Sequence, residues 1–131
     1  ICRIGRGLYS NALGFLGGFS WTVMCAHACQ LFPQAGPVEL IRNFFKYYNE
    51  FNWKDKAVVL DTPHSAKKPY KKDPKVCSFA TFAHFPLITS SLSEDLLTVV
   101  TICEPYKNSA RNVTQSTFAI IKRELADACA K

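Results

Sequence analysis

The chain lacks the long hydrophobic runs that membrane proteins need. No stretch of it approaches the ~20 consecutive apolar residues of a membrane-spanning helix. The N-terminus also lacks a charged segment followed by an apolar run and a small-residue cleavage site, so we predict no secretory signal peptide. Together the two absences predict an intracellular protein with no membrane partner.

Paired carboxylates are also missing. Ten Asp and Glu stand against sixteen Lys and Arg, a net charge of +6, and the five aspartates form no D-x-D pair. They are Asp55, Asp61, Asp73, Asp95 and Asp127. Two-metal phosphoryl transfer needs closely spaced carboxylates, so these aspartates offer no ligands for that chemistry. The excess of positive charge favours an anionic partner such as nucleic acid or nucleotide phosphate.

An initiator methionine is absent too, because the chain opens directly with Ile1. We therefore expect an excised or processed piece of a longer protein. Its 131 residues, 48% of them hydrophobic, are enough to bury a core without disulfides or a structural metal. We accordingly expect the six cysteines to be reduced and buried. Cys25 and Cys29 share a helix face while His27 points elsewhere, so this C-x-H-x-C run does not predict a zinc site.

The apolar periodicity predicts one mainly helical domain over residues 1–131. Apolar residues recur at three- and four-residue spacing from Phe19 to Phe32, and Pro33 ends that helix. Pro37 begins a second helix, which runs to about Phe51. The capping residues from Asn112 to Ser116 precede a closing helix that runs to about Ala130. We expect a helical bundle with one or two short β-strands.

Between the second and third helices the pattern is weaker. Ala57 to Leu60 is a short β-branched run that predicts a strand, and the Pro- and Lys-rich stretch from Thr62 to Lys75 predicts an exposed loop. Two further apolar runs, Phe85 to Thr89 and Leu96 to Ile102, fit either an extended or a helical conformation.

A long ordered motif opens the chain. The segment RGLYSNALGFLGGFSWTVMCAHACQLFP, from Arg6 to Pro33, closely resembles the signature of eukaryotic-type poly(A) polymerases, in which Y-x-N, G-F-x-G-G and C-Q-L-[YF]-P follow basic residues. The resemblance continues through FFKYYNEFNW, which ends at Trp53, through DPK and FPLIT, and through NVTQST, from Asn112 to Thr117. Most of the chain therefore resembles the central, substrate-binding domain of that family.

The resemblance implies a nucleotide site near the N-terminus. By it, Tyr9 hydrogen-bonds the triphosphate of ATP, Asn11 contacts the nucleoside, and Gly17 and Gly18 let the backbone lie against the nucleotide. A phenol can donate to phosphate oxygens, and a carboxamide can read an adenine or ribose edge, so the chemistry agrees. Phe19 stands where the family usually has Val, and its ring could stack on the base or narrow the pocket. Without the motif, a turn-capping Asn and a packed Tyr would be the simpler interpretation.

The family's base-contacting Thr has two candidates here. Thr89 in FPLIT is the better match, because it follows DPK at the expected distance. Thr101 is the rival, and it leaves the spacing to NVTQST intact. The sequence leaves both interpretations open.

Basic residues could hold phosphate around this site. Arg3 and Arg6 precede the motif, and further lysines lie in the predicted loop. The lysines are Lys67, Lys68, Lys71 and Lys72. Such residues form a plausible phosphate-steering patch for RNA, although a solvated surface explains them equally well.

The resemblance finally implies an activity for the full protein. Poly(A) polymerases transfer AMP from ATP to an RNA 3′ hydroxyl, with Mg²⁺ or Mn²⁺ held in a separate nucleotidyltransferase domain that this chain lacks. We therefore expect a nuclear, monomeric protein that binds ATP and the RNA 3′ end and meets cleavage and polyadenylation factors, while this chain alone binds no metal and is inactive. The rival hypotheses are a non-catalytic RNA-binding or scaffolding module, and a related nucleotidyltransferase that adds another nucleotide.

Overall fold

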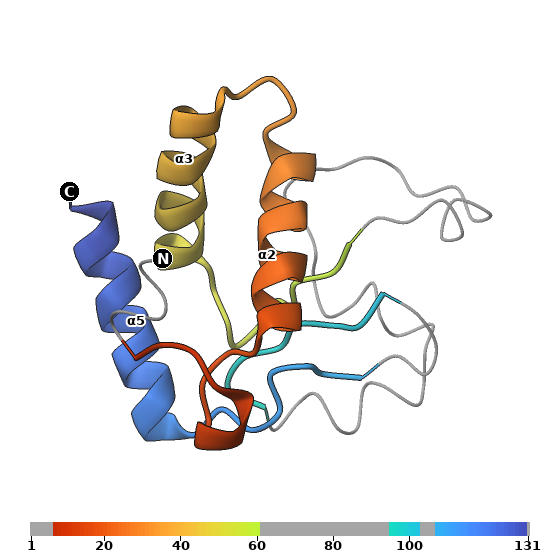
Figure 1. The fold of residues 1–131 in the computed structure, drawn as a ribbon, viewed down its shortest axis with the longest axis vertical. Helices are drawn as coiled ribbons and strands as arrows, with labels where there is room; N and C mark the ends of the chain where they lie inside the picture. The colour runs from red at the N-terminus through yellow and green to blue at the C-terminus, as the bar shows by residue number, and fades with distance from the viewer. Residues whose placement is uncertain (1–6, 61–94, 103–106, 131) are drawn as a thin grey trace.

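The computed structural model describes residues 7–60, 95–102 and 107–130. Helices dominate them. A 3-10 turn, η1 (Asn11–Leu13), precedes three α-helices, α2 (Gly18–Leu31), α3 (Pro37–Glu50) and α5 (Gln115–Cys129). Helices α2 and α3 form a hairpin, and α5 lies on the other side of α3 (Figure 1). The predicted mainly helical architecture is confirmed.

The helix ends follow the sequence signals closely. Pro37 occupies the first turn of α3 behind Gly36, where its fixed φ suits a helix start and its missing N–H costs nothing. Thr114 caps α5 in a reciprocal capping box with Thr117. Helix α2 begins behind Gly17 with no side-chain cap, and it ends at Leu31, before Pro33. All three predicted helices are confirmed, the first two to within one residue at both ends and the third to within one residue at its end.

The strand-like segments form isolated bridges. Val58 pairs with Val99 in parallel, and Val100 pairs with Asn108 in antiparallel. The run from Leu96 to Ile102 is therefore extended where it pairs. In the predicted strand from Ala57 to Leu60, Val58 forms a single bridge. The predicted loop at Thr62 to Lys75 and the FPLIT run lie outside the described residues.

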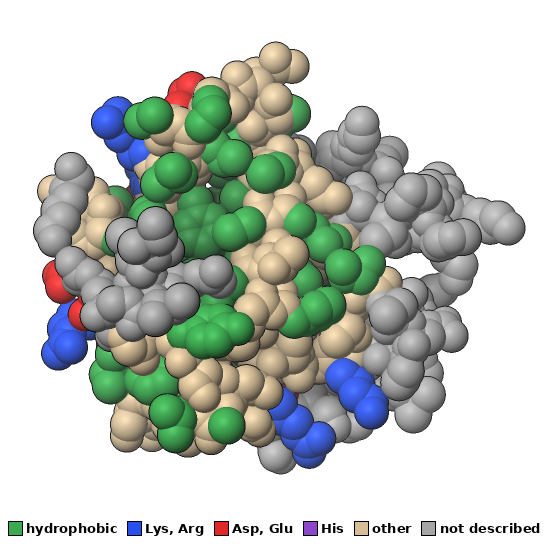
Figure 2. All heavy atoms as spheres, in the orientation of Figure 1, with side chains coloured by type: hydrophobic (Ala, Val, Ile, Leu, Met, Phe, Trp, Pro, Cys, Tyr) green, Lys and Arg blue, Asp and Glu red, His purple; other side chains and the backbone are tan. Residues whose placement is uncertain are grey.

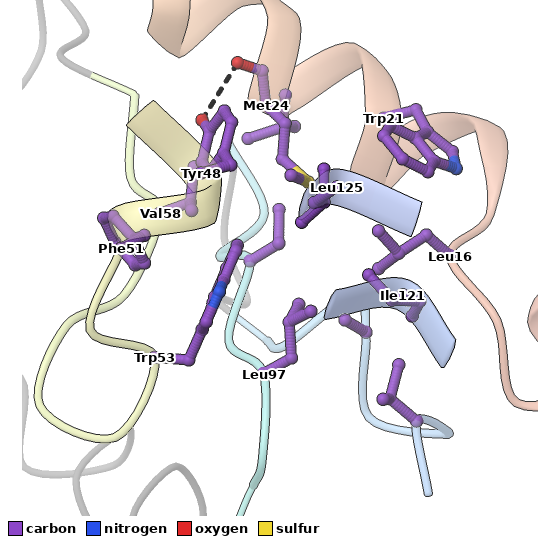
Figure 3. Packing of buried hydrophobic residues seen from close by; sticks show 14 of the residues in the cluster. Leu16, Trp21, Met24, Tyr48, Phe51, Trp53, Val58, Leu97, Ile121 and Leu125 are labelled. Atoms are coloured by element: carbon purple, nitrogen blue, oxygen red, sulfur yellow. Dashed lines mark hydrogen bonds between the residues drawn. The ribbon is translucent and has the colours of Figure 1, made fainter. Parts of the chain in front are cut away.

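One hydrophobic core joins these segments. Leu16, Met24, Tyr48, Val58, Leu97 and Ile121, which come from every part of the described chain, are all fully buried (Figure 3). The Tyr48 hydroxyl donates to the carbonyl oxygen of Met24 at 3.0 Å and also contacts His27 Nδ1 at 3.0 Å. This buried polar link ties α3 to α2.

The cysteines correct one expectation. Cys25, Cys29 and Cys129 are not in disulfides, as predicted, but all three are exposed. The predicted burial is therefore wrong for these three. Cys25 and Cys29 lie on α2, which carries no charged residue, so its sequence does not reveal which side faces outward.

Within the described ranges, no helix is long and apolar enough to cross a membrane.

Candidate functional site

A tight reversal of the chain builds the candidate site. The backbone N–H groups of Leu13 and Phe15 donate to the Ser10 carbonyl oxygen at 3.1 and 3.0 Å, which closes η1. Gly14 follows with φ 81°, a left-handed conformation that favours glycine. Tyr9 and Leu16 then bridge in parallel, with Leu16 buried and Tyr9 47% exposed. The reversal thus anchors one side of the loop in the core and leaves the Tyr9 ring at the surface.

The glycine pair accommodates the two candidate side chains. A Cβ added at Gly18 would stand 3.0 Å from the Tyr9 hydroxyl oxygen, and one added at Gly17 would stand 3.4 Å from the Asn11 Cβ. Tyr9 and Asn11 therefore lie directly against the start of α2. Phe19, 48% exposed, extends from the same turn. The structure brings together five of the predicted residues, Tyr9, Asn11, Gly17, Gly18 and Phe19.

The start of α2 suits an anionic ligand. The first backbone N–H groups of any α-helix have no partner inside the helix, and the helix dipole makes that end positive. The first turn of α2 contains no acidic residue and its N-cap, Gly17, provides no side chain. A phosphate near the Tyr9 hydroxyl would meet both donors and a favourable field.

One later segment, residues 107–112, holds this site in place. Asn112 Nδ2 donates to the Asn11 carbonyl oxygen at 3.3 Å, and a Cβ on Gly14 would meet the Asn112 carbonyl oxygen at 3.1 Å. Ser109 Oγ donates to the Val99 carbonyl oxygen at 2.9 Å, so Ser20 must donate in the 2.9 Å contact between the two serine hydroxyls. Sequence reasoning interpreted Asn112 only as part of a helix cap. Its contact with η1, 101 residues away, has no local signal.

The remaining predicted residues are not all described. Thr89, Arg3, Arg6 and the lysines at 67, 68, 71 and 72 lie outside the described residues. The rival Thr101 is described, and its Oγ1 accepts a hydrogen bond from the Lys107 N–H at 2.9 Å.

A hollow of about 300 Å³ lies elsewhere, between the end of α2 and the start of α3. Leu31, Pro33, Glu39 and Asn43 line it. It is at the opposite end of α2 from Tyr9, and no predicted site residue lines it. The exposed face of η1 and the first turn of α2 therefore remains the candidate site.

Ionisable side chains with metal-ligand chemistry do not gather in the described part of the chain. No group of three or more His, Cys, Asp or Glu residues there could hold a metal ion. We therefore assign the described residues no step that runs through a metal.

The glycines of this site should differ sharply in their tolerance of a methyl group. Gly14→Ala should lower the free energy of unfolding by at least about 1–2 kcal/mol, the cost of a left-handed non-glycine residue, since its Cβ also meets the Asn112 backbone oxygen at 3.1 Å. Gly18→Ala should leave stability within about 0.5 kcal/mol or raise it, because Ala favours the helix and only the end of the Tyr9 ring must move. Urea denaturation of both variants checks this, and equal losses would contradict it.

Known proteins resemble this chain along most of its length. The family described as "Poly(A) polymerase central domain" matches residues 3–130. "Nuclear poly(A) polymerase 1" of Arabidopsis thaliana is 34% identical over 119 residues, which cover 91% of this chain and 15% of that protein. "Poly(A) polymerase" of Dictyostelium discoideum is 34% identical over 122 residues, 92% of this chain and 13% of that protein. The chain therefore spans only a small part of the length of these relatives.

Proposed function

The chain belongs to the family of poly(A) polymerase central domains, and on that premise we propose that it supplies the ATP- and RNA-binding wall of an enzyme that adds AMP to RNA 3′ ends. The observation that carries the proposal is the packing of Tyr9 and Asn11 against Gly17 and Gly18 at the start of α2. This packing joins a phenol, a carboxamide and a helix N-terminus on one exposed face. Those groups match the phosphate, base and sugar of a nucleotide.

In this proposal each residue has its own part. The Tyr9 hydroxyl donates to a phosphate oxygen, and the Asn11 carboxamide reads an adenine or ribose edge. Phe19 stacks on the base, which its 48% exposure allows. Arg3, Arg6, Lys67, Lys68, Lys71 and Lys72 remain proposed RNA or phosphate contacts.

Both threonines remain proposed contacts to the base. The connections of the Val99 segment support Thr101. Val99 accepts from Ser109, and the hydroxyl of Ser109 contacts that of Ser20 in the first turn of α2. Thr101 follows Val99 by two residues, so it belongs to a segment that is already joined to the site. Thr89 is supported by the match of its FPLIT block to the family motif.

The rest of the proposal concerns the whole protein. Mg²⁺ or Mn²⁺ would be held by residues outside this chain. The chain alone should therefore bind ATP and RNA without transferring AMP to the RNA. One of the two relatives is named nuclear, which supports a nuclear location. A monomer that meets cleavage and polyadenylation factors completes the proposal.

Primer extension by the whole protein tests the activity. An oligo(A) RNA is offered with ATP, UTP, CTP and GTP separately, with Mg²⁺ or Mn²⁺. We expect extension with ATP alone. Extension with UTP would favour a related nucleotidyltransferase, and RNA binding without extension by any nucleotide would favour the RNA-binding scaffold.

Asn11→Ala should then separate ATP use from RNA binding. We expect kcat/KM for ATP to fall about 10- to 100-fold, equivalent to one or two hydrogen bonds of about 1.4 kcal/mol each, while the Kd for oligo(A) changes little. Asn43→Ala, on α3 and beside the hollow at the far end of α2, is the matched control and should behave as the wild type. Equal losses of ATP use and RNA binding would refute the role of Asn11.

A further inference from the structure

A short segment before α5, residues 107–112, runs alongside the candidate site. The hydroxyl of Ser109 lies 2.9 Å from that of Ser20, in the first turn of α2. Three residues later, Asn112 Nδ2 donates to the Asn11 carbonyl oxygen of η1 at 3.3 Å. The two contacts place this segment beside η1, which carries Asn11, and beside the first turn of α2, which carries Phe19.

The backbone of this segment is held rigidly. The Asn108 side chain accepts from the N–H groups of Val99 and Ala110 at 2.9 Å and donates to the Leu97 carbonyl oxygen at 2.8 Å. It also donates to Asp95 Oδ2 at 2.9 Å. A side chain that makes four hydrogen bonds fixes the residues around it before any ligand arrives.

Two cations extend from this fixed segment, Lys107 and Arg111, and both are exposed. Across ranges 7–60, 95–102 and 107–130, the ion pair observed joins Arg123 and Glu124, so neither of these cations is neutralised by a carboxylate there. Asp95, a carboxylate, is hydrogen-bonded to Asn108, the residue next to Lys107. Arg111, next to Asn112 and hence to η1, is therefore the stronger attraction for an anion.

The surrounding surface contrasts with these charges. Helix α2 has no charged residue in its fourteen positions, and hydrophobic side chains gather over the face of α2 and α3 (Figure 2). Lys and Arg side chains lie along the lower edge of that face, below the first turn of α2 (Figure 2). Phe19 in that turn and Tyr9, which packs against Gly18, both expose their rings. Exposed rings beside unneutralised cations are the combination that binds stacked bases and their phosphates.

We propose that Arg111, assisted by Lys107, binds a phosphate group at the candidate site, either in the RNA backbone or in the triphosphate of ATP. This inference rests on the proposed function and names a contact that neither the motif nor the family resemblance pointed to. A guanidinium presents a planar fork of donors that matches phosphate oxygens, and a rigid segment lowers the entropy lost when it binds.

The test uses the whole protein in four variants, Arg111→Ala, Arg111→Lys, Arg111→Glu and, as control, Arg42→Ala on the exposed side of α3. Fluorescence anisotropy measures the Kd for oligo(A) and for a fluorescent ATP analogue at several salt concentrations, and primer extension measures KM for ATP. We expect Arg111→Ala to raise one of these constants about 5-fold or more, Arg111→Lys to keep part of the affinity and Arg111→Glu to lose most.

The outcomes separate the two sources of phosphate. An RNA contact raises the Kd for oligo(A) and lowers the magnitude of its salt slope by about 1. A triphosphate contact raises KM and Kd for the nucleotide while RNA binding stays unchanged. The inference is overturned if Arg111→Ala matches Arg42→Ala in every measurement. Binding is measured apart from catalysis, so a wild-type protein that fails to polymerise counts against the proposed function only.

Discussion

Replacing Tyr48 with Ala should lower the free energy of unfolding by about 4 kcal/mol, the range found for the loss of a large buried aromatic side chain. Tyr48 is fully buried and is the centre of the aromatic part of the core. Its ring stacks on Trp53 at 5.7 Å between centroids and meets Phe44 edge-on at 4.8 Å. Its removal leaves a cavity where α2, α3 and the segment after α3 meet.

Tyr48→Phe is the matched control. It keeps the ring and removes only the hydroxyl, which leaves the Met24 carbonyl oxygen and His27 Nδ1 without this partner. We expect a loss of about 1–3 kcal/mol, the cost of unsatisfied buried polar groups. Urea denaturation followed by far-UV circular dichroism measures both variants. An Ala variant as stable as the Phe variant would show that the ring does not organise the core.

Acidification should destabilise the protein through His27. The Tyr48 hydroxyl donates its proton to Met24, so His27 Nδ1 must donate to the Tyr48 oxygen. Burial lowers the pKa of His27 from 6.5 to about 4, because the charged ring would lose its hydration. Between these two values the unfolded chain binds a proton that the folded chain does not.

His27 therefore leaves the free energy of unfolding unchanged above pH 6.5. As the pH falls towards 4, protonation of His27 in the unfolded chain lowers the free energy of unfolding by about 3 kcal/mol in all. His27→Gln keeps a donor for Tyr48 but cannot titrate in this range, so it is the control. The measurement is the free energy of unfolding from pH 7.5 to 4 for both proteins. Carboxylates titrate equally in both, so parallel curves would show that His27 does not cause the loss.

The helices could be predicted because their boundaries are marked locally. Pro33 and Pro37 delimit the turn between α2 and α3, and Thr114 with Thr117 marks the start of α5. The outward side of α2 could not be predicted, because a helix without charged residues has no polar face to identify. For that reason the exposure of the Cys25 and Cys29 thiols could not be predicted.

Only the part of the candidate site that is contiguous in sequence, residues 9–19, could be grouped before the structure was known. The Y-x-N and glycine motifs lie within ten residues of one another, and their resemblance to the family signature grouped Tyr9, Asn11, Gly17, Gly18 and Phe19. The contacts of Asn112 with η1 and of Ser109 with Ser20 join residues 101 and 89 positions apart. No local pattern encodes such pairs, and so the position of residues 107–112 beside the site could not be predicted.

The same long-range contacts have a consequence for how the protein is made. During synthesis, Tyr9 and Asn11 leave the ribosome about a hundred residues before Asn112 and the start of α5. Until those later residues emerge, η1 lacks the hydrogen bond from Asn112 and the packing of Gly14 against Asn112 and Thr117. Contacts that are so distant in sequence form late because their closure is entropically costly. A nascent chain therefore carries Tyr9 and Asn11 well before the surface of the candidate site is complete.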